Sequence, residues 1–169
     1  RDLTVGVRLS GDHEIAGGPT LADMQEAAAR LDGYGLADYA IVGGAAPETI
    51  ALQAALTPSL YFPRGVYNAL AGAIREVVQM PVIVIGRVVT PEMAEQVLAD
   101  GQADLVGMTR ALIADPHLPN KAQEGRVEEI RTCVGASEGC IGRLRYGRPI
   151  SCVQNPVIGR EAELAEVAP

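Results

Sequence analysis

The chain of 169 residues contains no tryptophan, one phenylalanine and five tyrosines. A core built from it must therefore be mainly aliphatic, and with 48% hydrophobic residues the chain is long enough to bury one as a single domain. It has no apolar run of the length of a membrane span, and the N-terminal stretch RDLTVGVRLS lacks the apolar centre of a signal peptide. These absences predict a cytoplasmic protein.

Basic residues and cysteines are also few. Lys and Arg number 14 against 21 Asp and Glu, which gives a net charge of −7, and there is no basic run. This composition argues against nucleic acid or an anionic membrane as the partner. The three cysteines are an odd number and fit a reducing compartment better than a disulfide framework. We therefore expect a small-molecule substrate, and we leave open a homo-oligomer.

What the chain does have is a fourfold alternation of strand and helix patterns. Strands are predicted at residues 3–9, 38–42, 81–85 and 103–107, and helices at 20–31, 66–78, 90–101 and from 111. Thr20, with Asp23 three residues later, is typical of a helix N-cap. The continuous apolar run at 81–85 is typical of a parallel strand covered on both faces. Four such units predict an α/β fold that is half of an eight-stranded barrel, with two open edges, so the chain is either a fragment or a dimer-forming half.

Two successive strand–helix turns each place an arginine beside small residues. Gly86 and Arg87 follow the third predicted strand, and Thr109 and Arg110 follow the fourth. Backbone N–H groups and a guanidinium at a helix N-terminus favour anion binding, and the last two loops of an α/β barrel commonly hold a phosphate. One such turn could equally be an ordinary loop with a surface arginine, but the presence of two successive turns of this kind favours a phosphate site.

Three other places are candidates for ligand contact. Arg8 lies near the end of the first predicted strand, where barrel active sites collect, although a neighbouring carboxylate could equally satisfy it. The turn Gly43-Gly44 permits close approach of a planar ligand. The long connection 45–64 carries Tyr61 and Phe62, and we predict that it forms part of a substrate pocket.

Cys133, Cys140 and Cys152 lie in a glycine-rich segment after the last predicted helix. Thiolates on such a segment can converge on one metal centre. Zinc is disfavoured because His117, the nearest histidine, lies sixteen residues before Cys133. From the residues alone, three free thiols in a packed extension remain an open alternative.

The stretch GRVVTPEMAEQVLADGQADLVGMTRALIADPHLPNKAQEG resembles the end of the flavin-binding barrel in the old yellow enzyme superfamily. More narrowly, it resembles the iron-sulfur branch that contains 2,4-dienoyl-CoA reductase, trimethylamine dehydrogenase, and the dimethylglycine and N-methylproline demethylases. The resemblance implies that residues 1–130 are strands five to eight of an FMN-binding TIM (β/α)8 barrel, that 131–156 are an iron-sulfur segment, and that 157–169 are a linker to a Rossmann-type domain. The catalytic residues would lie in the N-terminal half of the barrel, so we assign none here, and we expect the fragment alone to be inactive.

The same resemblance implies cofactor ligands. Arg8 would lie beside the pyrimidine edge of the flavin. The other implied FMN contacts are Gly43, Gly86, Arg87, Thr109 and Arg110. The family binds one 4Fe-4S cluster through four cysteines, and the first, third and fourth places are Cys133, Cys140 and Cys152, while the second is Ala136. Alanine cannot bind iron, so the cluster would take another ligand such as Ser137 or Glu138, keep an open iron, become a three-iron cluster, or be absent. We expect a cluster because the flanking GCIGR and CVQNP are retained.

The family offers two main reactions, and the sequence favours oxidative N-demethylation of a small methylated amine. The enoyl reductases have a histidine in the loop after the second strand, and none occurs between Gly43 and Pro63. Tyr61 and Phe62 could help to enclose an alkylated ammonium by cation–π attraction. The form GASEGCIGR also resembles the demethylases. The alternatives are an NAD(P)H-dependent 2,4-dienoyl-CoA reductase and, from another class, a non-redox phosphate-binding barrel fragment.

Overall fold

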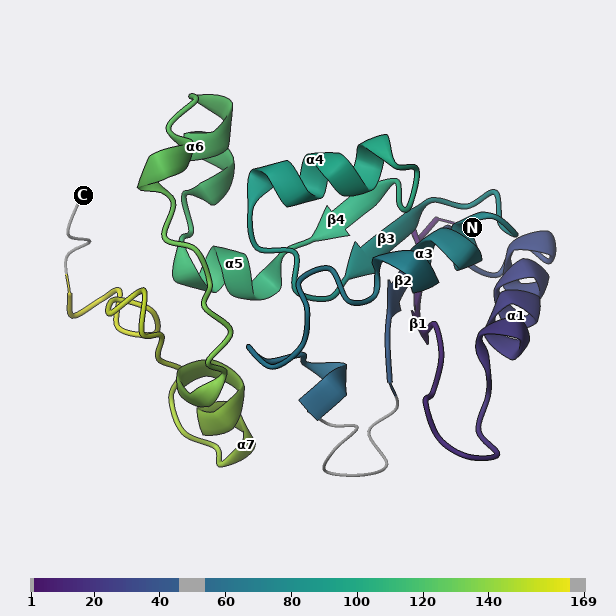
Figure 1. Ribbon diagram of the computed structural model, residues 1–169, viewed down its shortest axis with the longest axis horizontal. Helices are drawn as coiled ribbons and strands as arrows, with labels where there is room; N and C mark the ends of the chain where they lie inside the picture. The colour runs from purple at the N-terminus through teal and green to yellow at the C-terminus, as the bar shows by residue number, and fades with distance from the viewer. Residues whose placement is uncertain (1, 46–53, 165–169) are drawn as a thin grey trace. The chain divides into compact units, whose positions relative to one another are not determined.

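The computed structural model describes residues 2–45 and 54–164 of the chain (Figure 1). Its contacts divide the chain into two compact units. The first unit is Arg1–Val88 with Glu92–Gly107, and the second is Val89–Pro91 with Met108–Pro169. All the strands belong to the first unit, and the cysteine segment belongs to the second.

The first unit is built on a four-stranded parallel sheet in the order β1-β2-β3-β4 (Figure 1). The strands are β1 (Gly6–Ser10), β2 (Tyr39–Gly43), β3 (Val82–Ile85) and β4 (Leu105–Gly107). The predicted parallel α/β arrangement is confirmed, but each strand begins one to three residues later than predicted. Aspartates account for part of this difference. The carboxylates of Asp38 and Asp104 accept hydrogen bonds from the backbone N–H groups of Val5 and Val82, so side chains satisfy the backbone where the strands begin.

The sheet is accompanied by the helices α1 (Leu21–Gly33), α3 (Asn68–Arg75) and α4 (Pro91–Ala99). The predicted cap of α1 is present as a reciprocal pair, in which Thr20 accepts from the Asp23 backbone and Asp23 accepts from the Thr20 backbone at 2.8 Å. Helix α3 is shorter than the predicted 66–78, because Tyr67 before it has a non-helical backbone (φ −106°, ψ 7°). Helix α3 contacts β2, β3 and α1.

The core of the first unit lies on one face of the sheet and is aliphatic, as the composition predicts. Ala40, Val42, Val82 and Val84 on the strands, and Ala71 and Ile74 on α3, have no exposed surface. Val97 of α4 is 1% exposed, whereas Leu98, which the sequence places on the same apolar face, is 39% exposed. Helix α4 therefore buries a narrower stripe than its sequence pattern suggests.

The other face of the sheet carries one row of residues in register across all four strands. The row consists of Arg8, Ile41, Ile83 and Leu105. Arg8 and Leu105 are exposed, and the two isoleucines between them are partly buried. This face is therefore less covered than the face that α3 packs against.

Nearer the carboxyl ends of the strands, the side chain of Ile85 packs over two glycines, Gly43 and Gly107. A Cβ atom at Gly43 would lie 3.2 Å from the Ile85 side chain, and one at Gly107 would lie 2.5 Å from it. Large and small residues thus alternate across β2, β3 and β4, which resembles the way side chains fill layers inside a barrel.

The second unit contains short helical segments. They are α5 (Thr109–Ala114), α6 (Leu118–Gln123), the 3-10 turn η1 (Val127–Glu129), the π-helical turn η2 (Glu138–Gly142) and α7 (Arg143–Arg145). Helix α5 begins two residues before the predicted Ala111. In the described part of the chain, no helix is long and apolar enough to cross a membrane.

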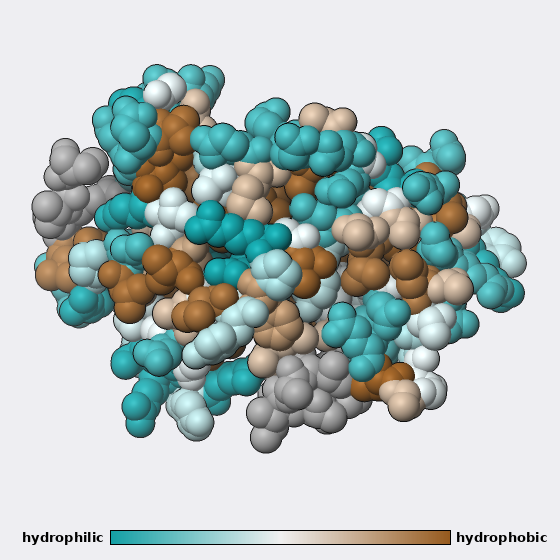
Figure 2. All heavy atoms as spheres, viewed as in Figure 1, coloured by the Kyte–Doolittle hydropathy of each residue, from teal (hydrophilic) through white to brown (hydrophobic). Residues whose placement is uncertain are grey.

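On the face drawn in Figure 2, hydrophobic residues are interspersed with hydrophilic ones. The exposed aromatic side chains include Tyr34, Tyr61 and Tyr146, which are 75%, 87% and 81% exposed. Among the described residues, Tyr67 is the one buried aromatic, at 2% exposed. Most aromatic surface of this chain is thus outside its core.

Candidate functional site

Arg8 lies in β1, and its side chain is exposed. Within residues 2–45 and 54–164, no hydrogen bond or ion pair joins its guanidinium to another residue. The neighbouring carboxylate that the sequence left open as its partner is thus not found in that part of the chain. Arg8 is the middle residue of β1, and an exposed cation that has no counter-charge among the described residues is suited to an anionic ligand.

The glycines after β2 and β3 are explained by packing inside the first unit. The planar group that lies against Gly44 is the ring of Tyr67, since a Cβ atom there would come within 1.9 Å of it, and one at Gly86 would come within 2.6 Å. Gly43 faces Ile85. The sequence analysis expected a planar ligand at this turn, whereas here the side chain of Tyr67 lies against Gly44. The flavin contacts of Gly43 and Gly86 stay predictions.

Tyr67 anchors this arrangement. Its hydroxyl donates a hydrogen bond of 2.6 Å to the carbonyl oxygen of Ala55. Burial, with a smaller contribution from the carboxylate of Glu14, raises the pKa of Tyr67 to about 12. From the sequence, Tyr67 was grouped with Tyr61 and Phe62 as an aromatic residue of the expected substrate pocket, and its packing against the two glycines was not foreseen. The position of Tyr67 just before a helix, together with glycines at 44 and 86, could have indicated that its ring is buried against these turns.

Arg87 has a left-handed backbone (φ 63°), and its side chain turns back onto the connection before α3. Its Nη1 atom donates to the carbonyl oxygen of Phe62 and, at 3.4 Å, to that of Leu60. Arg87 therefore fixes the segment that carries Tyr61 and Phe62. Its predicted contact with a phosphate is not tested by this geometry.

Tyr61 is 87% exposed and Phe62 is partly buried, so the two rings do not form a closed cage within the described residues. Part of the predicted pocket, residues 46–53, lies outside those residues. The exposed Tyr61 ring is accessible to a ligand.

Thr109 and Arg110 begin α5 in the second unit. Thr109 is exposed, and Arg110 is partly buried. The Nη1 atom of Arg110 donates to the hydroxyl oxygen of Ser137 at 3.3 Å. This contact joins the start of α5 to the cysteine segment, and no sequence pattern predicted it.

The three cysteines line one cavity. Cys133, Cys140 and Cys152 are free thiols, and each is partly buried. The whole pocket, counted with its opening to solvent, has an unfilled volume of about 310 Å³. Ala136 and Ser137 also line the cavity.

Hydrogen bonds connect the three segments that carry the cysteines around this cavity. The backbone N–H of Ser151 donates to the carbonyl of Gly139 at 2.7 Å, which ties the Cys152 segment to the Cys140 segment. The side-chain amide of Gln154 donates to the carbonyl of Thr132 at 3.3 Å, which ties the Cys152 segment to the Cys133 segment. The Gln154 backbone N–H also donates to the Cys152 sulfur at 3.4 Å, as suits a thiolate ligand.

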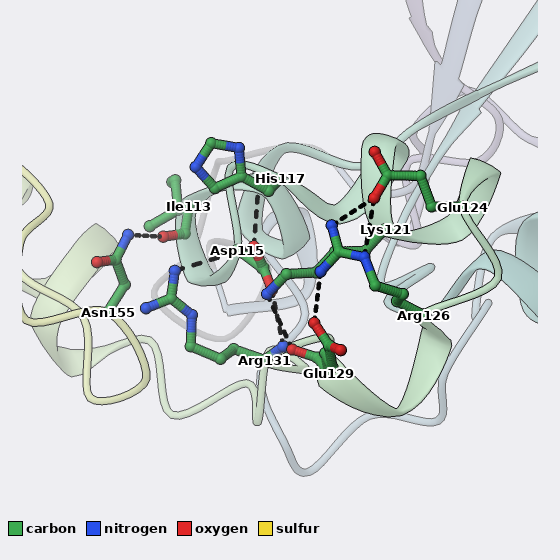
Figure 3. A network of polar contacts seen from close by, with 9 residues as sticks. All are labelled: Ile113, Asp115, His117, Lys121, Glu124, Arg126, Glu129, Arg131 and Asn155. Atoms are coloured by element: carbon green, nitrogen blue, oxygen red, sulfur yellow. Dashed lines mark hydrogen bonds and ion pairs between the residues drawn. The ribbon is translucent and has the colours of Figure 1, made fainter. Parts of the chain in front are cut away.

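A buried aspartate fixes the chain just before the first cysteine (Figure 3). The Asp115 carboxylate, with no exposed surface, accepts hydrogen bonds from the backbone N–H groups of His117 and Arg131, each at 3.0 Å, and from Lys121 at 2.9 Å. Burial alone would raise the pKa of Asp115, but these hydrogen bonds outweigh it and hold the pKa below its usual value. Arg131 is two residues before Cys133. The network thus positions the start of the cysteine segment.

The far end of the segment is also tied down. Asn155, 4% exposed, donates from its side-chain amide to the carbonyl of Ile113 in α5 at 2.9 Å (Figure 3). The retained CVQNP therefore has a structural role within the second unit, whatever the cysteines bind.

The three cysteine thiols can be compared with the ligands that an iron-sulfur cluster needs. In the described part of the chain, no three His, Cys, Asp or Glu side chains are arranged to hold a single metal ion. A cluster makes a different demand, because each thiolate binds a different iron. Three thiols around one cavity, with a backbone N–H directed at one sulfur, fit three corners of an iron-sulfur cluster.

The chain is similar to known flavin-dependent oxidoreductases and to related dehydrogenases. The model of the NADH:flavin oxidoreductase / NADH oxidase family matches residues 1–129. The chain is 38% identical over 164 residues to a metal reductase of Desulforamulus reducens, covering 97% of the chain and 24% of that protein. It is 39% identical over 160 residues to N,N-dimethylglycine/sarcosine dehydrogenase of Chromohalobacter salexigens, covering 95% and 23%.

Among solved structures, histamine dehydrogenase from Rhizobium sp. 4-9 matches with a TM-score of 0.82 and 29% identity, covering 94% of the chain and 22% of that protein. The chain thus spans about a quarter of the length of these relatives.

Proposed function

This chain belongs to the NADH:flavin oxidoreductase / NADH oxidase family, and from that membership we propose that it is part of an FMN-dependent oxidoreductase that demethylates a small N-methylated amine. In this proposal β1 to β4 are the last four strands of a (β/α)8 barrel, completed by a further segment of the same protein. The parallel sheet and the less covered row of Arg8, Ile41, Ile83 and Leu105 support it, since the inner face of a half barrel would be left uncovered.

The observation that carries the proposal is the exposed guanidinium of Arg8 on β1, which has no hydrogen bond or ion pair with any of the described residues 2–45 and 54–164. Reduction of a flavin places negative charge on its ring, and a fixed cation beside the ring stabilises that charge. Arg8 would have this role. Gly43, Gly86 and Thr109 would border the cofactor, and Arg87 and Arg110 would hold its phosphate.

The substrate class rests on similarity and on one side chain. The name of the Chromohalobacter relative identifies N-methylated amine substrates, and that of the Rhizobium relative identifies an amine. Tyr61 offers an exposed ring to an alkylated ammonium. Bound FMN would supply the acceptor for a hydride from the N-methyl carbon, and water would then hydrolyse the iminium to formaldehyde and the shorter amine.

The first test is a visible spectrum of the full-length protein purified without oxygen. Flavin and iron-sulfur absorption should both appear and should bleach on reduction. A colourless protein would instead support the non-redox phosphate-binding fragment.

The second test supplies N-methylproline, dimethylglycine or trimethylamine with an artificial electron acceptor, and formaldehyde should form. If no formaldehyde forms while a dienoyl-CoA is reduced at the expense of a nicotinamide, the 2,4-dienoyl-CoA reductase alternative is correct.

The third test concerns Arg8 itself. Arg8→Met should make the bound flavin harder to reduce, because its reduced anion loses a counter-charge. Arg30→Met is the matched control, since Arg30 is an exposed arginine that pairs with Glu26 on α1. Equal flavin potentials in the two variants would contradict the role given to Arg8.

A further inference from the structure

We infer that the cysteine segment holds a 4Fe-4S cluster through three thiolates only, and that the iron beside Ala136 has no protein ligand and is exchangeable. This inference rests on the proposed function in one respect, namely that the protein contains a cluster. It goes further by assigning this chain a cluster with one open coordination position.

The first step is the count of sulfur donors at the cavity. The sequence contains three cysteines, and all three line the same cavity, so no further thiol of this chain remains for a fourth iron. Ala136 also lines the cavity, three residues after Cys133 and four before Cys140. Its methyl group cannot bind iron, so one corner of a cluster placed there would face an inert side chain.

The second step concerns the two residues that could replace a fourth thiolate. The hydroxyl oxygen of Ser137 accepts from Arg110 at 3.3 Å, and the same hydroxyl lies 3.4 Å from the carbonyl of Gly135 as its donor. Ser137 is thus engaged on both sides in hydrogen bonds. Glu138 is exposed and is not among the described residues that line the cavity. Neither side chain is placed to take the vacant corner.

The third step concerns rigidity. Ser137 has a left-handed backbone (φ 64°) and precedes the π-helical turn that carries Cys140. A Cβ atom at Gly139 would lie 2.6 Å from the carbonyl oxygen of Ser151, so these two parts of the segment are closely packed. The backbone that follows Ala136 is therefore held by packing against the Cys152 segment, which restricts a rearrangement that would bring in another ligand. The open iron would take a small exogenous donor such as water, hydroxide or a low-molecular-weight thiol.

The inference is tested by controlled oxidation of the full-length protein after anaerobic reconstitution with Fe²⁺ and sulfide. Ferricyanide removes one electron from the 4Fe-4S cluster and takes it from the 2+ to the 3+ state. Loss of one Fe²⁺ then leaves a 3Fe-4S cluster in the 1+ state, so charge and iron balance. The expected result is loss of about a quarter of the cluster iron, with the paramagnetic signal of a three-iron cluster, and recovery after reduction with added Fe²⁺.

Ala136→Cys supplies the missing thiolate at a position that already carries a Cβ atom. This variant should keep its iron under the same oxidation. Ala29→Cys, which adds a thiol on α1 in the first unit, is the matched control and should lose iron as the unaltered protein does. Ser137→Ala and Glu138→Gln should also leave the loss of iron unchanged.

Each contrary outcome is distinct. Full retention of iron by the unaltered protein would overturn the inference, and retention that fails only in Ser137→Ala or Glu138→Gln would identify the fourth ligand. A protein that binds flavin but forms a cluster only as Ala136→Cys would overturn the inference and leave the flavin part of the proposed function intact. A protein that binds neither flavin nor cluster would overturn both.

Discussion

The Nζ atom of Lys121 lies 2.9 Å from Oδ2 of Asp115, and the two residues are 3% and 0% exposed (Figure 3). Lys121 also donates to the carbonyl oxygen of Glu129 at 2.9 Å. Because Asp115 accepts from the backbone N–H of Arg131 as well, the pair joins α6 to the chain that enters the cysteine segment. One buried ion pair thus sets where Cys133 can lie within the second unit.

Replacing Lys121 by Met should destabilise the protein by about 3–5 kcal/mol, because the buried Asp115 carboxylate then loses its nearest cation and keeps only the Arg131 guanidinium at 3.9 Å. Urea unfolding of the full-length protein measures the change. Arg126→Gln is the control, since Arg126 forms ion pairs with Glu124 and Glu129 at the surface, where such pairs contribute little. A similar loss in the free energy of unfolding in both variants would show that the buried Lys121–Asp115 pair stabilises the protein no more than a surface ion pair does.

The same pair predicts a dependence on pH. Since the hydrogen bonds to Asp115 lower its pKa in the folded state, the charged form stabilises the fold above the unfolded pKa of about 3.9, and this contribution is lost as the pH falls through the lower folded pKa. The stability difference between the unaltered protein and Asp115→Asn should therefore be largest near neutral pH and should shrink in strong acid. Urea unfolding at several pH values measures it, and a constant difference would contradict the prediction.

Gly44→Ala should destabilise the first unit by about 1–3 kcal/mol, because the new Cβ atom would lie 1.9 Å from the Tyr67 ring. Gly33→Ala is the control, since a Cβ atom at that end of α1 meets nothing within 4 Å. Combining Gly44→Ala with Tyr67→Leu should cost less than the sum of the two single changes. Additive losses would show that the ring is not what excludes a side chain at position 44.

Arg110→Ala should weaken FMN retention by about 1.5–3 kcal/mol if Arg110 makes a charge-assisted contact with the phosphate. Equilibrium release of flavin from the full-length protein measures the change. Two controls separate this effect from others. Ser137→Ala keeps Arg110 and removes its contact with the Ser137 hydroxyl, together with the weak hydrogen bond from that hydroxyl to Gly135. Arg160→Ala removes an exposed arginine that donates to Pro156. Loss of flavin in Ser137→Ala to the same degree would assign the effect to the cysteine segment instead.

The sequence predicted the parts of the fold that local patterns determine. Apolar runs such as 81–85, the Thr20–Asp23 cap and the stop at Gly101, which has a left-handed backbone (φ 67°), all depend on a few neighbouring residues. The convergence of three cysteines was also predictable, because they are close in sequence and separated by glycines.

Other features depend on where the chain goes in space. Asp115 and Lys121 lie in a polar stretch that resembles a surface loop, and their burial requires the Arg131 backbone to return to them. Tyr67 was assigned to a helix, although it is buried against glycines from two separate turns. Leu98 fits the period of its helix, but the part of α4 that it occupies is not covered.

The packing of Ile85 over Gly43 and Gly107 links three positions on three adjacent strands. A larger residue at either glycine could be accommodated only if position 85 became smaller, because the same volume serves both. Among homologues, these three positions should therefore change together and not singly, and their covariation would record the shape of the sheet where its strands end.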